Sequence, residues 1–218
     1  LDAGKHVLTE ARMANTAQEA RDMLAASRAH PDLVCQLTPT STSYKTDNLL
    51  KKMIGEGFLG EILSVEMQAL QNRFPDYGGD LHWRHDWELS GYNTLNIGAS
   101  YESLMRWVGP ATDVYAMTRV AVPQRRDADG IVRSVTVPDH VDVLCQIGGG
   151  AQAHLAFSAV TGLGAAGDLW LFGAEGTLHL DTARMTLSGG RRGASALEEI
   201  PISPEKEDSW RVEEEFIN

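Results

Sequence analysis

The chain has 218 residues, of which 43% are hydrophobic, and carries a formal net charge of −11 at pH 7. A chain of this length and composition can bury a real core in one large domain or in one and a half, which excludes a disordered protein. The negative charge argues against nucleic acid as a partner, and no apolar run is long enough to make a membrane a partner.

The first elements are predicted to be a strand, a helix and a second strand. His6–Thr9 is an apolar run typical of a short buried strand. Thr16 and Glu19 have the spacing of a capping box, which predicts that a helix begins here and continues until Pro31 ends it. Leu33–Leu37 is the next expected strand. A βαβ unit of this kind pairs its two strands in parallel.

A linker, a helix and a long strand are expected next. Pro39–Tyr44 is rich in Thr and Ser, which is typical of a linker. A helix is predicted over about Lys45–Glu56, because apolar residues recur there at helical spacing and Gly57 can end it. Apolar and polar residues then alternate in Glu61–Leu70, which predicts a half-buried strand of an open sheet.

The central helix is predicted over Asn93–Gly109, directly after the irregular segment Gln71–Gly91, which is rich in aromatic residues and histidine. Its first turn carries Asn96, Ser100 and Tyr101, although the rest of the helix has an apolar stripe. A polar first turn either faces a cleft or supplies a helix cap. On this stretch alone, capping is the favoured interpretation.

The rest of the chain is predicted to form strands. Arg125–Gly130 is expected to be a charged loop, and Gly148–Gly150 is a hairpin signal. Because helices precede a run of strands, the expected fold class is α+β, with an open, mostly antiparallel sheet and helices on one face. The predicted strands are Asp113–Val122, His140–Ile147, Ala151–Val160, Leu169–Phe172, Thr177–Leu180 and Met185–Leu187.

The chain has two cysteines, Cys35 and Cys145, and both lie in apolar, strand-like runs. We expect both to be small buried residues, not a disulfide or a metal pair. Unpaired cysteines are typical of a reducing compartment, and no signal-peptide pattern opens the chain, so the expected location is the cytoplasm.

Several stretches, taken in order, resemble the glucose–fructose oxidoreductase/inositol dehydrogenase/MocA (GFO/IDH/MocA) family. Each match is short, but together they extend over nearly the whole chain. The resemblance implies an NAD(P)-dependent oxidoreductase of sugars or polyols, with an N-terminal Rossmann domain and a C-terminal α+β domain. The matching stretches are Gly4–Glu10 (GKHVLTE), Met53–Ile62 (MIGEGFLGEI), Trp83-Arg84 with Ser90-Gly91, Leu95–Gly109 and Leu171–Leu180 (LFGAEGTLHL).

The resemblance also implies how the chain is organised and what it binds. Residues 1–38 would be the last βαβ part of the Rossmann domain, without its glycine-rich phosphate loop, so the chain is expected to be an interior piece of a longer protein. Residues 39–218 would form the substrate and oligomerisation domain, assembling a homodimer or homotetramer through the sheet face. The implied cofactor is NAD or NADP. The implied cofactor-binding residues are Glu10, Trp83 and Arg84, and the implied substrate-binding residues are Asn96, Ser100 and Tyr101.

The sequence departs from the family at its catalytic positions. The family's catalytic lysine follows the glutamate of an EKP motif, but Glu10 is followed here by Ala11, which cannot transfer a proton. The family's Asp and His on the central helix align with Asn96 and Ser100, which hydrogen-bond but are neutral. Arg12 or Lys5 could supply the missing charge, although arginine exchanges protons poorly near neutral pH. The site is therefore expected to bind better than it reacts.

Two further motifs have alternative interpretations. Gly162–Gly167 matches a dinucleotide fingerprint literally, but strand-like residues follow it instead of a helix, so a loop between strands is favoured. His82, His85 and Asp86 have the spacing of metal ligands. Ordinary polar residues of a cleft-lining loop are the favoured interpretation of these three.

Three functions follow from these observations. The first is an oxidoreductase of this family, impaired at Ala11. The second is a catalytically silent relative that binds a ligand or serves assembly. The third is a metal-dependent isomerase or lyase. All three depend on one spatial expectation, which is that Glu10, Arg84 and the opening turn of the central helix meet around a common hollow.

Overall fold

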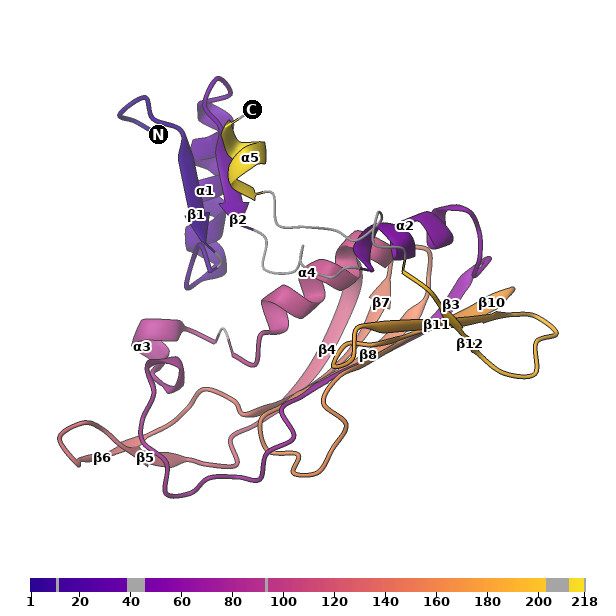
Figure 1. Cartoon of the computed structure of the whole chain (residues 1–218). Helices are drawn as coiled ribbons and strands as arrows, with labels where there is room; N and C mark the ends of the chain where they lie inside the picture. Colours follow the sequence, from indigo (N-terminus) through magenta and orange to yellow (C-terminus); the bar gives the residue numbers. More distant parts are fainter. Residues whose placement is uncertain (11, 39–45, 93, 203–211, 218) are drawn as a thin grey trace.

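The structure is a computed structural model that describes residues 1–10, 12–38, 46–92, 94–202 and 212–217. Figure 1 shows a small unit formed by the start of the chain and a larger unit built on a sheet, with helix α4 (Ile97–Val108) on the side of the sheet that faces the small unit. Among the described residues, no helix is both long and apolar enough to cross a membrane. The linker predicted at Pro39–Tyr44 lies outside the described residues.

The small unit is the predicted βαβ unit. Strands β1 (Val7–Glu10) and β2 (Cys35–Thr38) pair in parallel, and helix α1 (Ala17–Ala29) connects them. The Thr16 hydroxyl accepts a hydrogen bond from the Glu19 backbone N–H at 3.2 Å, so the N-cap predicted from the capping box is confirmed.

The prediction that the first strand is buried is wrong. Val7 and Leu8 are 36% and 37% exposed, and none of the described residues of α1 is buried. Cys35, which was also expected to be buried, is exposed. The physical reason is that two strands and one helix cannot enclose a core of their own. Cys145 is buried as expected, and burial raises the pKa of its thiol.

The described end of the chain returns to the small unit. Helix α5 (Val212–Ile217) lies beside β2 (Figure 1), where the Gln36 side-chain amide donates a hydrogen bond to the Val212 carbonyl oxygen at 3.5 Å. Residues from both ends of the chain therefore meet in this unit. The domain division at residue 38 stays a prediction.

The larger unit begins with helix α2 (Asp47–Gly55) and strand β3 (Ile62–Leu70), close to the predicted ranges. Gly57, with a φ of +76°, follows the helix as expected. Val65 and Met67 are buried on one face of β3, but Leu63, predicted to share that face, is 52% exposed. The pairing register shifts between Ile62 and Ser64, so a bulge turns Leu63 out of the alternation.

In the described part of the chain, eight strands form one open sheet in the order β12-β11-β10-β9-β3-β8-β7-β4. The β3–β8 pairing is parallel and the other six are antiparallel, so the predicted fold class, α+β with a mostly antiparallel sheet, is confirmed. The remaining strands are β4 (Ala111–Arg119), β7 (His140–Ile147), β8 (Gln152–Ser158), β9 (Asp168–Gly173), β10 (Gly176–Asp181), β11 (Thr186–Arg191) and β12 (Glu198–Ile200).

The expected charged loop at Arg125–Gly130 is instead part of a small hairpin. Strands β5 (Gln124–Arg126) and β6 (Val132–Ser134) pair antiparallel outside the main sheet. The Asp127 carboxylate accepts hydrogen bonds from the backbone of Asp129 and Ile131, which closes the turn between the strands. These turn contacts are short-range, but the Arg-rich strand residues gave no apolar alternation from which to predict them.

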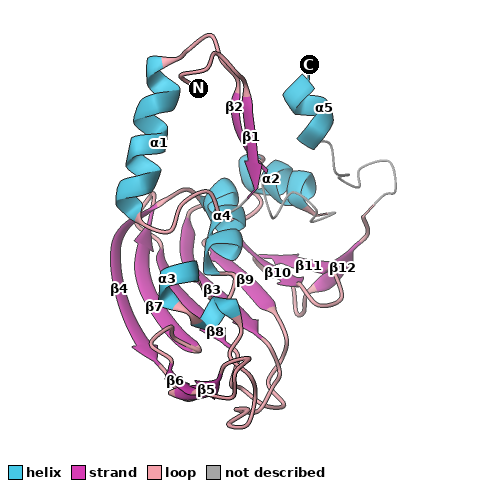
Figure 2. Cartoon of the chain, turned by 90° about the vertical axis from the view of Figure 1, so that its left-hand side faces the viewer, coloured by secondary structure: helices cyan, strands magenta, loops and turns pink. Residues whose placement is uncertain are grey.

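The core lies between one face of the sheet and helices α2 and α4, as Figure 2 shows. Leu50 from α2 and Leu104 from α4 are fully buried against Val65, Leu155 and Phe157 of the central strands. Both helices lie on this face, as predicted, and this leaves the other face of the sheet open. The buried residues of α4 all lie in its second half, which packs against the sheet. Its first turn lies nearer to the small unit (Figure 1).

Candidate functional site

A cavity of about 500 Å³ lies between the small unit and the start of α4. Its walls come from the loop between β1 and α1, from Arg84 in the aromatic segment, and from the first turns of α4. These three stretches are far apart in the sequence. The fold therefore brings part of the predicted site together at the place where the two units meet.

The start of α4 has an unusual backbone. Leu95 and Asn96 both have a φ of 57°, in the left-handed region that non-glycine residues adopt at a cost of about 1–2 kcal/mol each. Asn96 occupies the N-cap position, but its side chain makes no capping hydrogen bond, because a cap needs an extended backbone there. The capping interpretation of Asn96 is therefore wrong. Its exposed amide instead lies on the cavity wall.

The other two polar residues of the first turn have different surroundings. Tyr101 lines the cavity, and its hydroxyl oxygen accepts a hydrogen bond from the Ala111 backbone N–H at 2.8 Å. This bond ties α4 to the first residue of β4. Ser100 is half-buried and lies outside the cavity lining. Of the three predicted substrate-binding residues, Asn96 and Tyr101 thus share one cavity.

Trp83 carries two guanidinium groups on its ring. The Cζ atom of Arg84 lies 4.2 Å from the centroid of the indole ring, and that of Arg12 lies 4.6 Å from it. The indole is 43% exposed, and both arginines line the cavity. Burial, and after it the charge of Arg84, lower the pKa of Arg12 from its usual value. Sequence reasoning placed Trp83 and Arg84 together but did not include Arg12 among the site residues.

Two further predicted positions belong to the end of β1. Glu10 is exposed and lies outside the cavity lining, so the structure does not place it with Arg84 and the opening of α4. Ala11, at the position of the family's lysine, lies outside the described residues. Arg12, directly after it, lines the cavity together with Met13, Ala14 and Thr16 of the same loop.

The histidines of the aromatic segment organise the backbone around Trp83 and Arg84. The Nδ1 atom of His85 accepts from the His82 N–H at 3.1 Å, and the Nδ1 atom of His82 accepts from the Arg84 N–H at 3.2 Å. These bonds form a capping box around the short 3-10 helix η1 (Trp83–His85). Burial, followed by the charges of Arg125 and His82, lowers the pKa of His85.

Asp86 has a similar structural contact. Its carboxylate accepts from the Glu88 N–H at 2.9 Å and caps helix α3 (Trp87–Ser90). Among the residues that the structure describes, no three His, Cys, Asp or Glu side chains are grouped so that they could hold a metal ion.

Gly162–Gly167 is a loop, as predicted. It connects β8 to β9, and β9 begins directly after it at Asp168. A dinucleotide fingerprint requires a helix at that place, whose N-terminus faces the pyrophosphate. This glycine-rich stretch therefore does not have the geometry of a phosphate-binding loop.

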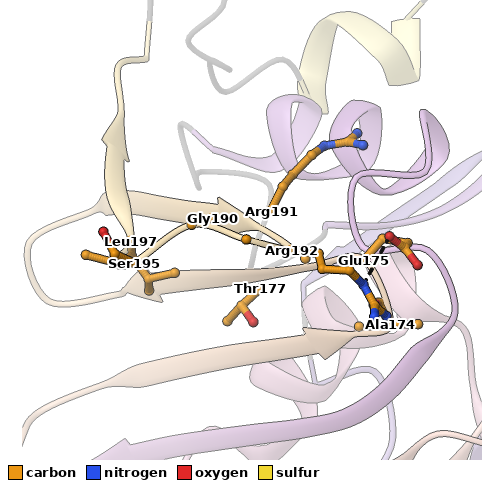
Figure 3. Close-up of a pocket in the computed structure, with 13 residues that line it drawn as sticks. Ala174, Glu175, Thr177, Gly190, Arg191, Arg192, Ser195 and Leu197 are labelled. Atoms are coloured by element: carbon orange, nitrogen blue, oxygen red, sulfur yellow. Dashed lines mark hydrogen bonds and ion pairs between the residues drawn. The ribbon is translucent and has the colours of Figure 1, made fainter.

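A second hollow, of about 390 Å³, lies at the turns that connect strands β9 to β12 (Figure 3). Arg192 there forms an ion pair with Glu175, with its Nε atom 3.4 Å from the carboxylate, and its guanidinium also donates to the Ala174 carbonyl oxygen. Arg191 points away from this pair and lies over the Phe58 ring at 5.0 Å. Both cations of this hollow thus have partners within the protein.

Comparison with known proteins gives a consistent result. A family model described as the GFO/IDH/MocA C-terminal domain matches residues 48–179. Levoglucosan dehydrogenase from Pseudarthrobacter phenanthrenivorans is 26% identical over 242 residues, which cover 97% of this chain and 60% of that protein.

Solved structures share the fold. A levoglucosan dehydrogenase in complex with NADH and levoglucosan matches with a TM-score of 0.81 and 24% identity, over 96% of this chain and 58% of that one. An oxidoreductase domain protein from Kribbella flavida matches with a TM-score of 0.82 and 25% identity, over 92% of this chain and 56% of that one. The chain spans 60% or less of the length of each of these relatives.

Proposed function

The chain belongs to the GFO/IDH/MocA family, and from this premise we propose that it is the substrate-binding part of an NAD(P)-dependent oxidoreductase of a sugar, a polyol or a related small molecule. The observation that carries the proposal is the cavity between the two units, which Arg84 and Asn96 both line. A relative in complex with NADH and levoglucosan supports an NAD-type cofactor and a sugar as ligands. In this proposal, residues 1–38 are the remnant of the dinucleotide-binding domain, and residues 39–218 are the substrate domain.

The residues at the cavity fit the nicotinamide end of such a cofactor. The indole of Trp83 holds Arg12 and Arg84 over its ring and is proposed to contact the nicotinamide through the part of the ring that stays exposed, while Arg84 offers a planar fork to an anionic or carbonyl oxygen. When bound, the cofactor would accept a hydride from a hydroxyl-bearing carbon of the substrate. The role of this chain would be to hold the sugar, because the Asn96 amide, which makes no capping hydrogen bond, can both donate to and accept from hydroxyl groups. Glu10 is proposed to contact the cofactor from the end of β1.

The first test uses the full-length protein and measures binding of NADH and NADPH from the fluorescence of the cofactor; a panel of sugars and polyols is then assayed for turnover. We expect at least one of the two cofactors to bind with a dissociation constant in roughly the micromolar range and the Trp83→Ala variant to bind it more weakly. The exposed Trp87→Ala variant serves as the matched control, since Trp87 is 49% exposed but, unlike Trp83, does not hold either of the arginines that line the cavity. Absence of binding of both cofactors would contradict the proposal.

We propose further that the activity is impaired, because Ala11 replaces the lysine and because neutral Asn96 and Ser100 replace titratable residues. Ala11→Lys is expected to raise the dehydrogenase rate, since a positioned acid or base contributes about 10²–10⁴-fold. A lysine introduced on the exposed side of α1, at Ala25, is the control and should leave the rate unchanged. An unchanged rate in Ala11→Lys, together with cofactor binding, would favour the second candidate, a silent relative that only binds its ligand.

We also propose that the protein is a homo-oligomer, a dimer or a tetramer, that associates through the open face of the sheet. Tyr115 and Leu144 lie directly opposite each other on β4 and β7 and are 77% and 59% exposed, and Met117 on the same face is 78% exposed. Large apolar side chains that are exposed side by side support an interface. Two free cysteines support the cytoplasm as the proposed location.

A further inference from the structure

The two arginines at the cavity come from separate elements and share one aromatic ring. Arg12 extends from the loop after β1, and Arg84 lies in the 3-10 helix η1. Their Cζ atoms lie 4.6 Å and 4.2 Å from the centroid of the Trp83 ring. A cation over an indole is stabilised by the ring, but two cations on one ring repel each other. The arrangement therefore concentrates positive charge at one end of the cavity.

Neither arginine has a carboxylate partner among the described residues. The ion pairs of that part of the chain involve other basic residues, such as Arg106 with Asp47 and Arg133 with Asp127. The chain contains 30 acidic and 19 basic residues, so acidic side chains are abundant. Glu102 also lines the cavity, but it forms no ion pair with either arginine. Two guanidinium groups that have no carboxylate partner in the described part of the chain, although the net charge is −11, are suited to an anionic ligand.

Apart from Arg12, Arg84 and Glu102, the residues that line the cavity are uncharged. Asn96 offers an amide, and Leu95 and Ala99 offer apolar surface. An amide is suited to sugar hydroxyls and apolar surface to sugar C–H groups, whereas a guanidinium fork is suited to the two oxygens of a carboxylate. A molecule that carries a carboxylate at one end and hydroxyl groups along the rest of its length would match both the arginines and the wall around Asn96.

We propose that Arg12 and Arg84 bind the carboxylate of an acidic sugar, a uronate or an aldonate, and so select it over the neutral sugar of the same shape. This proposal rests on the proposed function, because it assigns a substrate class to the same cavity. The phosphates of a bound cofactor are the other possible source of an anion. They are disfavoured because Arg12 and Arg84 line the same cavity as Asn96, at the start of α4, where the sugar is proposed to bind.

The test is calorimetric titration of the full chain with three matched pairs of probes: D-glucuronate and D-glucose, D-galacturonate and D-galactose, and D-gluconate and D-glucitol. Each titration is done with and without NADH or NADPH. We expect at least one acid to bind about tenfold or more tightly than its neutral partner, and Arg12→Gln to remove that preference. Arg12→Lys keeps the positive charge but not the planar guanidinium, so it should retain part of the preference for the acid. Arg21→Gln, on α1 outside the cavity lining, is the matched control and should retain all of it.

The outcomes separate the two proposals. If no acid binds more tightly than its neutral partner, or if Arg12→Gln leaves the preference intact in a protein with wild-type thermal unfolding, the carboxylate assignment is wrong. If Arg12→Gln weakens the binding of NADH or NADPH but not that of the acid, Arg12 binds a phosphate of the cofactor and the carboxylate assignment is also wrong. If an acid binds with the expected preference but neither cofactor binds, the oxidoreductase proposal fails while the acidic-ligand site stands.

Discussion

A buried carboxylate anchors the helix on which the site depends. Asp47 is 4% exposed and accepts hydrogen bonds from the Trp107 indole N–H at 2.6 Å and from Arg106 at 2.7 Å, while the Lys51 ammonium lies 2.9 Å away. Asp47 is the first residue of α2, whereas Arg106 and Trp107 lie near the end of α4, so the contacts of Asp47 with these two residues join the two helices. They hold the end of α4 opposite to the one that carries Asn96.

Asp47→Ala should therefore be strongly destabilising. The substitution leaves the partly buried cations Arg106 and Lys51 without their carboxylate, and removal of one partner of such a group costs about 3 kcal/mol or more. Urea unfolding would measure the loss. Asp113→Ala, an exposed carboxylate on β4, is the matched control and should change the free energy of unfolding by about 0.5 kcal/mol or less. Equal effects of the two substitutions would contradict this role of Asp47.

His85 predicts a pH dependence at the residue scale. Burial, followed by the charges of Arg125 and His82, lowers the pKa of folded His85 below the ordinary value of 6.5. In the folded state its Nδ1 atom accepts the His82 N–H. The unfolded chain therefore takes up this proton at a higher pH than the folded one. The stabilising contribution is complete above about pH 6.5 and is lost as the pH falls through the lowered pKa.

His85→Asn is expected to make thermal stability fall less steeply between about pH 7.5 and about pH 5, because an amide oxygen can accept the same hydrogen bond without titrating. The melting temperature measured across this range tests it. Gln71→Asn, an exposed substitution that changes no titratable group, is the control and should keep the wild-type slope. If the slope of His85→Asn equals that of the wild type, titration of His85 does not contribute to stability.

At the residue scale, the sequence identified the site where a motif was local and missed it where the contact was distant. Trp83 and Arg84 are adjacent, so one short motif contained both. Arg12 reaches the same indole only after the chain has folded, and no periodicity relates the two positions. The visible signal was that Arg12 occupies the position of the proline in the family's EKP motif, a change from a rigid apolar residue to a cation. The wrong capping interpretation of Asn96 had the same origin, because residue type does not reveal a positive φ.

At the scale of elements, the cavity depends on a close contact between α3 and the loop before α1. Gly91 follows α3 with a φ of +55°, and a methyl group added there would lie 2.7 Å from the Asn15 carbonyl oxygen. Both the backbone angle and the contact require glycine. The loop that carries Arg12 continues to Asn15, so the spacing at Gly91 also sets where that loop lies against the rest of the cavity.

Gly91→Ala should destabilise the protein by about 1–3 kcal/mol and weaken ligand binding at the cavity, because the backbone has to move on one side or the other. Gly55→Ala, at the end of α2, is the matched control: the added methyl group meets no atom within 4 Å, so stability should be unchanged or slightly higher. Thermal unfolding and the calorimetric titrations described above measure both effects. A Gly91→Ala protein of wild-type stability and affinity would contradict this role of the contact.

Elements with a strong repeating pattern were predicted from the sequence, and those fixed by tertiary contacts were not. The βαβ unit, the two longer helices α2 and α4 of the larger unit and most strands of the sheet follow from capping residues, apolar periodicity and glycine turns. The bulge at Leu63 and the β5–β6 hairpin do not, since the first depends on the register with β9 and the second on contacts around Asp127. Burial of β1 was wrongly predicted because an apolar run does not reveal how many neighbouring strands will cover it.

At the scale of the whole molecule, the two faces of the main sheet differ in composition. One face is covered by α2 and α4 and is lined by buried aliphatic side chains. The open face carries exposed apolar side chains next to charged groups, such as Asp142, whose carboxylate contacts His140 at 2.9 Å and His154 at 3.2 Å. Burial, the largest single effect, raises the pKa of Asp142, but the hydrogen bonds and charges of the two histidines together outweigh it and lower the pKa below its usual value. A face that combines fixed charges with exposed aromatic and aliphatic groups has the composition of a protein interface.

The proposed assembly through this face is tested by Met117→Glu. Met117 is 78% exposed and lies opposite Asp142, so a glutamate there weakens the strand pairing through like-charge repulsion, and in an interface it would also place a charge against apolar surface. We expect light scattering to give a dimer or a tetramer for the wild type and a shift toward the monomer for Met117→Glu. Leu163→Glu, in the loop after β8, is the matched control: Leu163 is 86% exposed, and its replacement should leave the mass unchanged. A monomeric wild type, or equal masses for wild type and Met117→Glu, would show that this face does not join the subunits.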